Sequence, residues 1–314
     1  MIKTFFSIIL AGLIFLSAIA LTLFQLESPK MLIGQAQKVD LYGKLSARLA
    51  DVDTSALVKQ SNFSNKDMAE IITYAIDGKT FYEMLETSST AYINYVTGKS
   101  KDFKLTLDLK GVKSRAQEKL IGRASSNYDN YPLCKGKEIS GWNVNSKCKL
   151  PNNSLSDSDL SRLSRSQSQV ILDQIPDTLN YDQPSKSLES TRNTVSRVNK
   201  GVYLLWFITI FLILLFFMIS RVGAFWPLSI SCILAGLLLL GFSMIGWDYL
   251  VRTLTEFLSA STKANPWTEL GIAFGTQLIG TLKTFMGNLS IGILGTGGAC
   301  IILAVAMRFK KSGA

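Results

Sequence analysis

Residues 202–220 read VYLLWFITIFLILLFFMIS, a stretch without a charged side chain and as long as a helix that crosses a bilayer. A helix rises about 1.5 Å per residue, so roughly 20 apolar residues span the hydrocarbon core of a membrane. Three further runs, residues 4–24, 228–246 and 289–307, also lack Asp, Glu, Lys, Arg and His. The sequence therefore predicts an integral membrane protein with four transmembrane helices.

The longest polar part of the chain, residues 25–200, lies between the first and second runs. It holds 25 basic and 20 acidic side chains, a net charge of +5, and is long enough to bury one independent core. A shorter polar interval, residues 247–288, separates the third and fourth runs. The predicted fold class is mainly α: a four-helix transmembrane bundle with a mostly helical domain outside the lipid and at most a minor β element near residues 103–109.

Basic residues flank the runs at ends that a chain of four spans brings to the same side of the membrane. These topology anchors are Lys3, Arg221, Arg308, Lys310 and Lys311. The positive-inside rule makes that side cytoplasmic. In the plasma membrane, residues 25–200 and the helical hairpin 247–288 are then expected to be extracytoplasmic, and residues 308–314 form a basic cytoplasmic tail.

The first run also has an interpretation as a signal peptide, with Lys3 as its basic start and Ala18-Ile19-Ala20 as its cleavage site. The apolar part of a signal peptide is about 7–15 residues long, whereas this run continues through Phe24. We therefore favour an uncleaved span. Residues 25–200 face outward under either interpretation.

The four cysteines fall into two pairs. Cys134 and Cys148 lie in the long polar block, 14 positions apart, and Cys232 and Cys300 lie in the third and fourth runs. An outward-facing pair at this spacing can close a disulfide loop worth about 3 kcal/mol in the chain-entropy model. The alternative is two free thiols. A zinc site has little support, because the chain contains no histidine.

Helical periodicity dominates the long polar block. The expected helices are residues 30–39, 41–49, 64–78, 80–97, 111–123 and 155–175. Residues 103–109 differ, because Phe103, Leu105, Leu107 and Leu109 alternate with polar residues at the period of a strand. A lone strand leaves its backbone groups unpaired, so this one needs a partner, for which residues 142–144 are a candidate.

Three helices, those of the second, third and fourth spans, are expected to continue past the lipid. Residues 185–200 contain no Pro or Gly and lead into the second run, which predicts one helix from about Ser185 to Ser220. Residues 247–262 and 266–288 extend the third and fourth spans as apolar-striped helices that meet at Asn265-Pro266. This hairpin either packs on the outer domain or lies in the membrane interface.

Small residues in the third and fourth runs recur four positions apart, a spacing that lets helix backbones approach closely. The candidate packing residues are Gly292, Gly295 and Ala299 in the fourth run, and Cys232 and Gly236 in the third. Packing within one chain and homodimerisation both use this pattern. We favour packing within the chain.

The sequence gives no support to the common catalytic and cofactor-dependent chemistries. Without histidine, Ser-His-Asp and Cys-His catalysis and histidine-ligated metal sites are excluded. P-loop, HExxH and Gly-x-Ser-x-Gly motifs are absent from the sequence. We therefore expect no catalytic residues, no cofactor and no metal. The net charge is +10, but the sequence contains no run of five or six basic residues. Nucleic acid is therefore not an expected partner.

Three functions stay open, and we favour a non-catalytic interaction or sensing module of the cell envelope. Its partners would be the lipid bilayer and a membrane or envelope protein, or further copies of the chain. The second is an envelope hydrolase that uses outer carboxylates. The third is a subunit of an oligomeric pore, which the absence of ionisable residues in the spans disfavours. The polar linings available to a pore are Thr209, Ser229, Ser231, Ser243 and Thr296.

Four short motifs give the chain a resemblance to a group of uncharacterised bacterial four-span membrane proteins with a large extracytoplasmic domain between the first two spans. The motifs are YINYVTG (92–98), KLTLDLK (104–110), PLC (132–134) and IPD (175–177). They cover a modest part of the polar block. The resemblance implies the same topology and an envelope location, and it implies no activity. The chain differs from tetraspanins, whose large loop lies between the last two spans and carries a Cys-Cys-Gly motif.

Overall fold

The computed structural model describes residues 2–49, 63–136, 148–150, 171–173, 175–220, 224–261 and 266–312, with the single residues 139, 165, 168 and 169. The chain divides into two compact units. Unit 1 comprises Met1–Val39, Tyr92–Lys101 and Pro184–Ala314, and unit 2 comprises Asp40–Ala91 and Asp102–Gln183. Three pieces of the long polar block therefore group with the apolar helices. The structure is mainly helical, as predicted.

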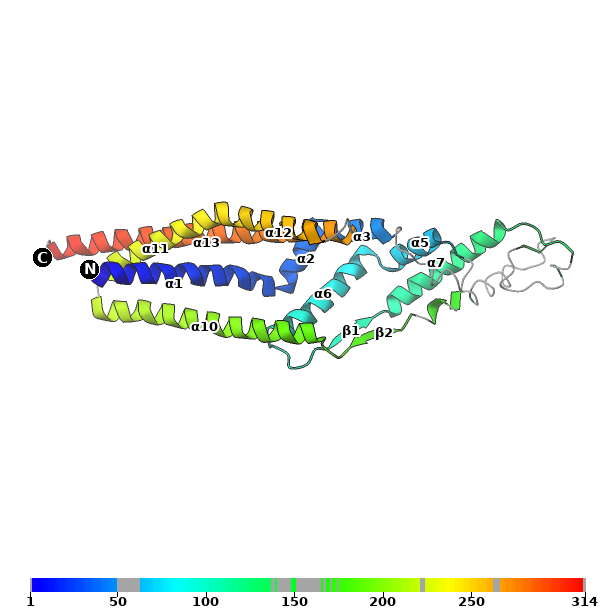
Figure 1. Ribbon diagram of the computed structural model, residues 1–314, viewed down its shortest axis with the longest axis horizontal. Coiled ribbons are helices and arrows are strands. Elements are labelled where there is room, and N and C mark those ends of the chain that lie inside the picture. Colours follow the sequence, from blue (N-terminus) through cyan, green and yellow to red (C-terminus); the bar gives the residue numbers. More distant parts are fainter. Residues whose placement is uncertain are drawn as a thin grey trace. The chain divides into compact units, whose positions relative to one another are not determined.

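Unit 1 is a bundle of long helices. Its elements are α1 (Ile2–Phe24), η1 (Gln25–Glu27), α2 (Pro29–Lys38), α10 (Lys186–Ser220), α11 (Phe225–Gly241), η4 (Phe242–Gly246), α12 (Trp247–Ser261) and α13 (Pro266–Ser312). Helix α11 packs between α1 and α13, and α10 packs on α1 (Figure 1). The start of α1, the end of α13 and the junction between α10 and α11 lie at the same end of this bundle.

Four of these helical segments are long and apolar enough to cross a membrane. They are Phe5–Glu27, Lys186–Met218, Phe225–Thr253 and Glu269–Met307. The four predicted apolar helices are therefore confirmed, and we treat the chain as a multi-pass membrane protein.

The helices extend well beyond the apolar runs. Helix α10 begins at Lys186, one residue from the predicted start, and continues unbroken to Ser220. Helix α13 has 47 residues, a length of about 70 Å, whereas the hydrocarbon core is about 30 Å thick. Its first half packs on α2, where the side chain of Gln277 donates a hydrogen bond to Gln35 Oε1 (3.4 Å).

A π-helical segment, η4, interrupts the third span where it leaves the apolar run. A π-turn holds one more residue than an α-turn. The wider turn keeps Leu239, Ser243 and Trp247, four positions apart, on the buried side. Trp247 Nε1 donates to Met286 Sδ of α13 (3.4 Å). Periodicity did not predict this segment, because one extra residue hardly changes an apolar run.

Unit 2 is built on α5 and α7. Its elements are α3 (Leu41–Leu49), α5 (Asn65–Ala75), most of α6 (Gly78–Val96), β1 (Leu105–Asp108), α7 (Lys110–Asp129) and β2 (Thr178–Tyr181). Helix α5 packs on both α7 and α3. Its start is fixed by a capping box, in which the Ser64 and Asp67 side chains each bond the other residue's backbone N–H. The buried core contains Phe63, Met68, Ile71, Ala75, Val112, Ala116, Leu120, Ile171 and Leu172.

The predicted strand exists, but its partner differs from the one we expected. Strand β1 pairs antiparallel with β2, with Leu105 opposite Tyr181 and Asp108 opposite Thr178. The expected partner, residues 142–144, lies outside the described residues, as does most of the helix predicted over 155–175. Strand β2 was missed because it has only four residues, too short a run to show a clear strand period, and all four are exposed.

Candidate functional site

Cys134 and Cys148 form a disulfide, as their place in the polar block led us to expect. Two backbone hydrogen bonds lie next to the disulfide. Cys134 N–H donates to the Lys149 carbonyl (2.9 Å), and Lys149 N–H donates to the Pro132 carbonyl (2.8 Å). The disulfide therefore joins two short segments that also pair through their backbones. Cys232 and Cys300 are buried free thiols in α11 and α13.

The predicted packing residues divide between two faces. Gly236 lies where α11 approaches α13, since a Cβ at this position would be only 2.6 Å from Leu294 Cγ. Cys232 lies at the same contact, 3.3 Å from where a Cβ on Gly297 would be. These two residues pack as expected, but their counterpart on α13 is Gly297, whose carbonyl accepts a bond from the Ser229 hydroxyl (2.8 Å).

Gly292 and Gly295 are not at this contact, contrary to our expectation. A Cβ on either would meet no atom within 4 Å. Both lie with Ala299 on the exposed side of α13. The α13 sequence places small residues on two faces of the helix, and only the packing of α11 shows which face is used.

The hydroxyl groups that we considered as pore linings mostly tie helices together. Four of them are buried, and their bonds are Thr209 to Ser17 (3.2 Å), Ser229 to the Gly297 carbonyl (2.8 Å), Ser231 to the Ser7 carbonyl (2.9 Å) and Ser243 to the Lys283 carbonyl (3.1 Å). The fifth, Thr296, is exposed and bonds the Gly292 carbonyl in its own helix. The four buried groups therefore stabilise contacts between helices of one chain.

The topology anchors gather at one end of unit 1 as far as the structure describes them. Lys3 is in the first turn of α1, and Arg308, Lys310 and Lys311 are in the last turns of α13. These helix ends lie together (Figure 1). Arg221 lies outside the described residues.

Two adjoining hollows on the surface of unit 2 form the best candidate for a binding site, which we call the α5–α7 groove. One has a volume of about 300 Å³ and is lined by Tyr74, Glu118, Lys119, Gly122, Arg123 and Ser126. The other has a volume of about 510 Å³ and is lined by Ser46, Lys66, Ala69, Glu70, Thr73, Tyr74 and Lys119. Tyr74 and Lys119 line both, so they stand between the two hollows.

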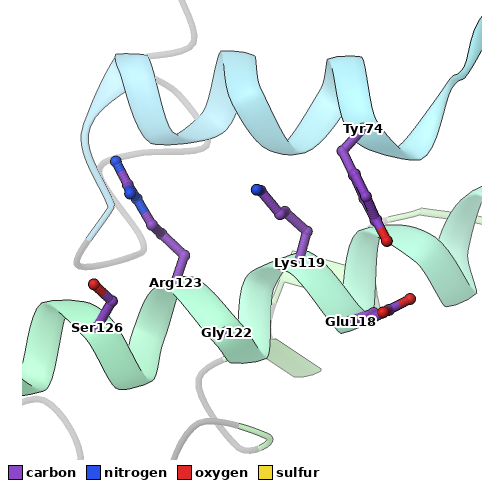
Figure 2. Close-up of a pocket in the computed structure, with 6 residues that line it drawn as sticks. All are labelled: Tyr74, Glu118, Lys119, Gly122, Arg123 and Ser126. Carbon is purple, nitrogen blue, oxygen red and sulfur yellow. The ribbon is translucent and has the colours of Figure 1, made fainter.

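Lys119 and Tyr74 form a cation–π pair in the middle of the groove. The Lys119 ammonium lies 5.4 Å from the centroid of the Tyr74 ring, and 42% of Tyr74 is exposed. Figure 2 shows Tyr74 pointing from α5 toward α7 and Lys119 pointing from α7 toward α5. Such a pair contributes about 0.5–1 kcal/mol at an exposed site. It holds a positive charge and an aromatic edge in a defined place.

Arg123, one turn after Lys119 on α7, is balanced by acids of α5. Its Nε contacts Asp67 Oδ1 at 2.5 Å, and its Nη2 lies 3.7 Å from Glu70 Oε2. Burial alone raises the pKa of Asp67, but hydrogen bonds from Ser64 and from Arg123 outweigh it and lower that pKa below its ordinary value. Asp67 therefore stays ionised and fixes the Arg123 side of the groove.

The groove offers cations and hydroxyl groups to a ligand. Lys66 and Lys119 supply cations, and Ser46, Thr73 and Ser126 supply hydroxyl groups. Each hollow is lined by a single glutamate, Glu118 in the first and Glu70 in the second, whereas glycoside hydrolysis needs two facing carboxyl groups. Within the described residues, no cluster of three Asp, Glu or Cys side chains is placed to hold a metal ion.

Sequence reasoning did not find the groove. Lys119 and Arg123 share a face of α7 at i, i+4 spacing, and Tyr74 lies near the end of α5. Charged residues at that spacing are common on any solvated helix. The signal that distinguishes them, a ring on a neighbouring helix under the ammonium group, exists only in three dimensions.

Comparisons of this chain with protein-family models, with curated proteins and with solved structures found no match.

Proposed function

We propose that this protein is a non-catalytic interaction module of the cell envelope, anchored by four transmembrane helices. In this proposal unit 2 faces outward and binds an acidic segment of a protein partner in the α5–α7 groove. The observation that carries the proposal is the Lys119 ammonium, held over the Tyr74 ring between two open hollows.

The orientation rests on two features. Basic residues gather at the bundle end that holds Lys3 and the end of α13, and such residues favour the cytoplasmic side. The Cys134–Cys148 disulfide belongs to unit 2, and disulfides persist in oxidising compartments. Both features support an extracytoplasmic unit 2 in the plasma membrane.

The charges around the groove favour an acidic ligand. Among the described residues, Arg123 pairs with Asp67 and Glu70, and no such ion pair includes Lys66 or Lys119. The larger hollow therefore presents Lys66 and Lys119 beside Glu70, and Glu70 already forms an ion pair with Arg123. A carboxylate of a partner can bond the Lys119 ammonium while an apolar group of the same segment packs on Tyr74.

The shape of the groove favours a protein segment over a sugar or a small molecule. Its hollows are shallow and open to solvent, and they lie on both sides of the Lys119–Tyr74 pair. Small-molecule pockets usually enclose most of their ligand. The face of the Tyr74 ring under Lys119 is already covered, so it does not offer the open aromatic surface on which a sugar ring would stack.

Direct binding measurements on the full-length protein in lipid nanodiscs test this proposal. The probes are an acidic peptide, its neutral amide counterpart and an acidic polysaccharide. We expect the acidic peptide to bind best. K119E should weaken its binding about tenfold or more, since a charge-assisted bond is lost and repulsion is added. The control K79E changes a lysine that is 84% exposed on α6 and should leave binding within about twofold.

Equal binding by K119E and the unaltered protein would contradict the groove assignment, and preference for the polysaccharide would contradict the partner class. Crosslinking in native membranes followed by purification of the full chain gives a second readout. We expect a specific envelope protein to be recovered with the unaltered chain and lost with K119E. Repeated recovery of the chain alone would count against an interaction module.

A further inference from the structure

We infer that a pocket on unit 1, between α12 and α13, binds the headgroup of a zwitterionic phospholipid that carries a phosphate and a primary amine. The pocket has a volume of about 410 Å³. The residues that matter to the inference are Trp247, Asp248, Arg252, Thr276, Gly280 and Lys283, and we call this site the headgroup pocket. It is separate from the α5–α7 groove and does not depend on it.

The position of the pocket along the membrane normal matches the headgroup layer of a bilayer. The apolar run of the third span ends at Gly246, and that of the fourth begins at Leu289. Asp248 follows Gly246 by two residues, which is about 3 Å along the helix. Lys283 precedes Leu289 by six residues, which is about 9 Å. Ile245, just inside the apolar run, is 75% exposed, as a lipid-facing side chain would be.

Two cations of the pocket can receive a phosphate. Lys283 Nζ contacts Asp248 Oδ1 at 2.7 Å, and Arg252 Nε contacts Glu256 Oε1 at 2.9 Å. Both acids are 66% exposed, and exposed ion pairs contribute little stability, so a ligand exchanges with them readily. The bond to Glu256 uses Arg252 Nε, and a guanidinium has further N–H donors that suit phosphate geometry.

The Lys283–Asp248 pair selects for an amine in the ligand. The lining of the pocket holds two cations, Arg252 and Lys283, and one carboxylate, Asp248. A phosphate that draws Lys283 away from Asp248 leaves this carboxylate to bond a primary ammonium group of the same headgroup. An anionic headgroup without an amine would break the same ion pair and give Asp248 no new partner.

The helix registers bring these groups to one side. Asp248 and Arg252 are one turn apart on α12, and Thr276, Gly280 and Lys283 recur at i, i+4 and i+7 on α13. Trp247, which follows η4 directly, is 6% exposed and lines the pocket. Gly280 leaves open space, since a Cβ at this position would meet no atom within 4 Å.

Native mass spectrometry of the full-length protein in detergent tests the inference. Short-chain phosphatidylethanolamine, phosphatidylcholine and phosphatidylglycerol are added singly at equal concentration. We expect phosphatidylethanolamine to be retained best. G280L should fill the pocket and K283M should remove a phosphate donor, and each should lower retention about tenfold. The control G271L changes another α13 glycine with open space around it and should leave retention unchanged.

Four results would overturn the inference. Equal retention by G280L and the unaltered protein would place the lipid elsewhere, and an equal loss in G271L would show a general effect on α13. Preference for phosphatidylglycerol or phosphatidylcholine would contradict the role of the amine. Free phosphoethanolamine is added as a competitor, and we expect it not to displace the lipid. Displacement at equal concentration would identify a soluble phosphate compound as the ligand instead.

Discussion

Gly236 allows α11 and α13 to approach closely at one point of unit 1. A Cβ there would lie 2.6 Å from Leu294 Cγ and 3.2 Å from Leu294 N, and the backbone atom cannot move away as a side chain can. G236A should therefore lower stability by about 1–3 kcal/mol through overpacking. Thermal unfolding of the full chain in detergent, followed by circular dichroism, measures the effect.

The matched control for this prediction is G295A. Gly295 is exposed on the same helix pair, with open space around its Cα. Ala favours a helix over Gly by about 0.5–1 kcal/mol, so G295A should be neutral or slightly stabilising. Equal destabilisation by the two substitutions would show that both glycines lie in tight contacts, contrary to the structure.

Asp67 makes the stability of unit 2 depend on pH. Its folded-state pKa is lowered, so its stabilising contribution is complete above the unfolded pKa, about 4, and is lost as the pH falls through the folded pKa. The full chain should lose thermal stability below about pH 4. D67N should already be less stable at pH 7, by about 1–3 kcal/mol, because the Arg123 contact and the capping box lose a charged acceptor.

Unfolding of D67N between pH 3 and pH 7 should therefore show a flatter pH profile than that of the unaltered chain. E83Q is the control, since Glu83 is 64% exposed and lies 3.9 Å from Lys79, a pair worth little in solvent. An unchanged pH profile in D67N would mean that another acid carries the effect.

At the scale of elements, η4 is a turn with one extra residue in a helix that otherwise continues regularly from α11 into α12. Deleting Ile245, which is exposed inside η4, should convert the π-turn to an α-turn and leave α11 and α12 close to their present registers. The deleted chain should keep most of its thermal stability in detergent.

The contrasting deletion removes Leu237, an exposed residue in the regular part of α11. It rotates the flanking helix by about 100°, because α-helical residues follow at 3.6 per turn. Leu239 and Trp247 would then leave their buried positions, so this chain should fail to fold or aggregate on size-exclusion chromatography. Similar behaviour of the two deletions would show that η4 does not absorb an extra residue.

At the scale of the whole molecule, the proposed orientation predicts which residues an impermeant reagent reaches. K104C places a thiol next to β1 in unit 2, and K310C places one at the end of α13. In intact cells a membrane-impermeant maleimide should label K104C and should label K310C only after the membrane is opened. The reverse pattern would invert the topology and remove the case for an outward-facing groove.

Local properties of the sequence determined by themselves the four apolar helices, their continuation beyond the apolar runs, the start of α5 and the strand of residues 105–108. Each depends on run length, period or neighbouring residues, which act over one or two turns. The disulfide pair followed from its place in the polar block. These features need no knowledge of what packs against them.

Only the tertiary structure decided which surfaces meet. It paired β1 with the exposed β2, chose Gly297 over Gly292 and Gly295 as the contact of α11, and set Lys119 of α7 over Tyr74 of α5. Such choices depend on how two complete surfaces fit, because packing and pairing energies arise between residues far apart in the chain. The groove and the headgroup pocket both arise from that fit.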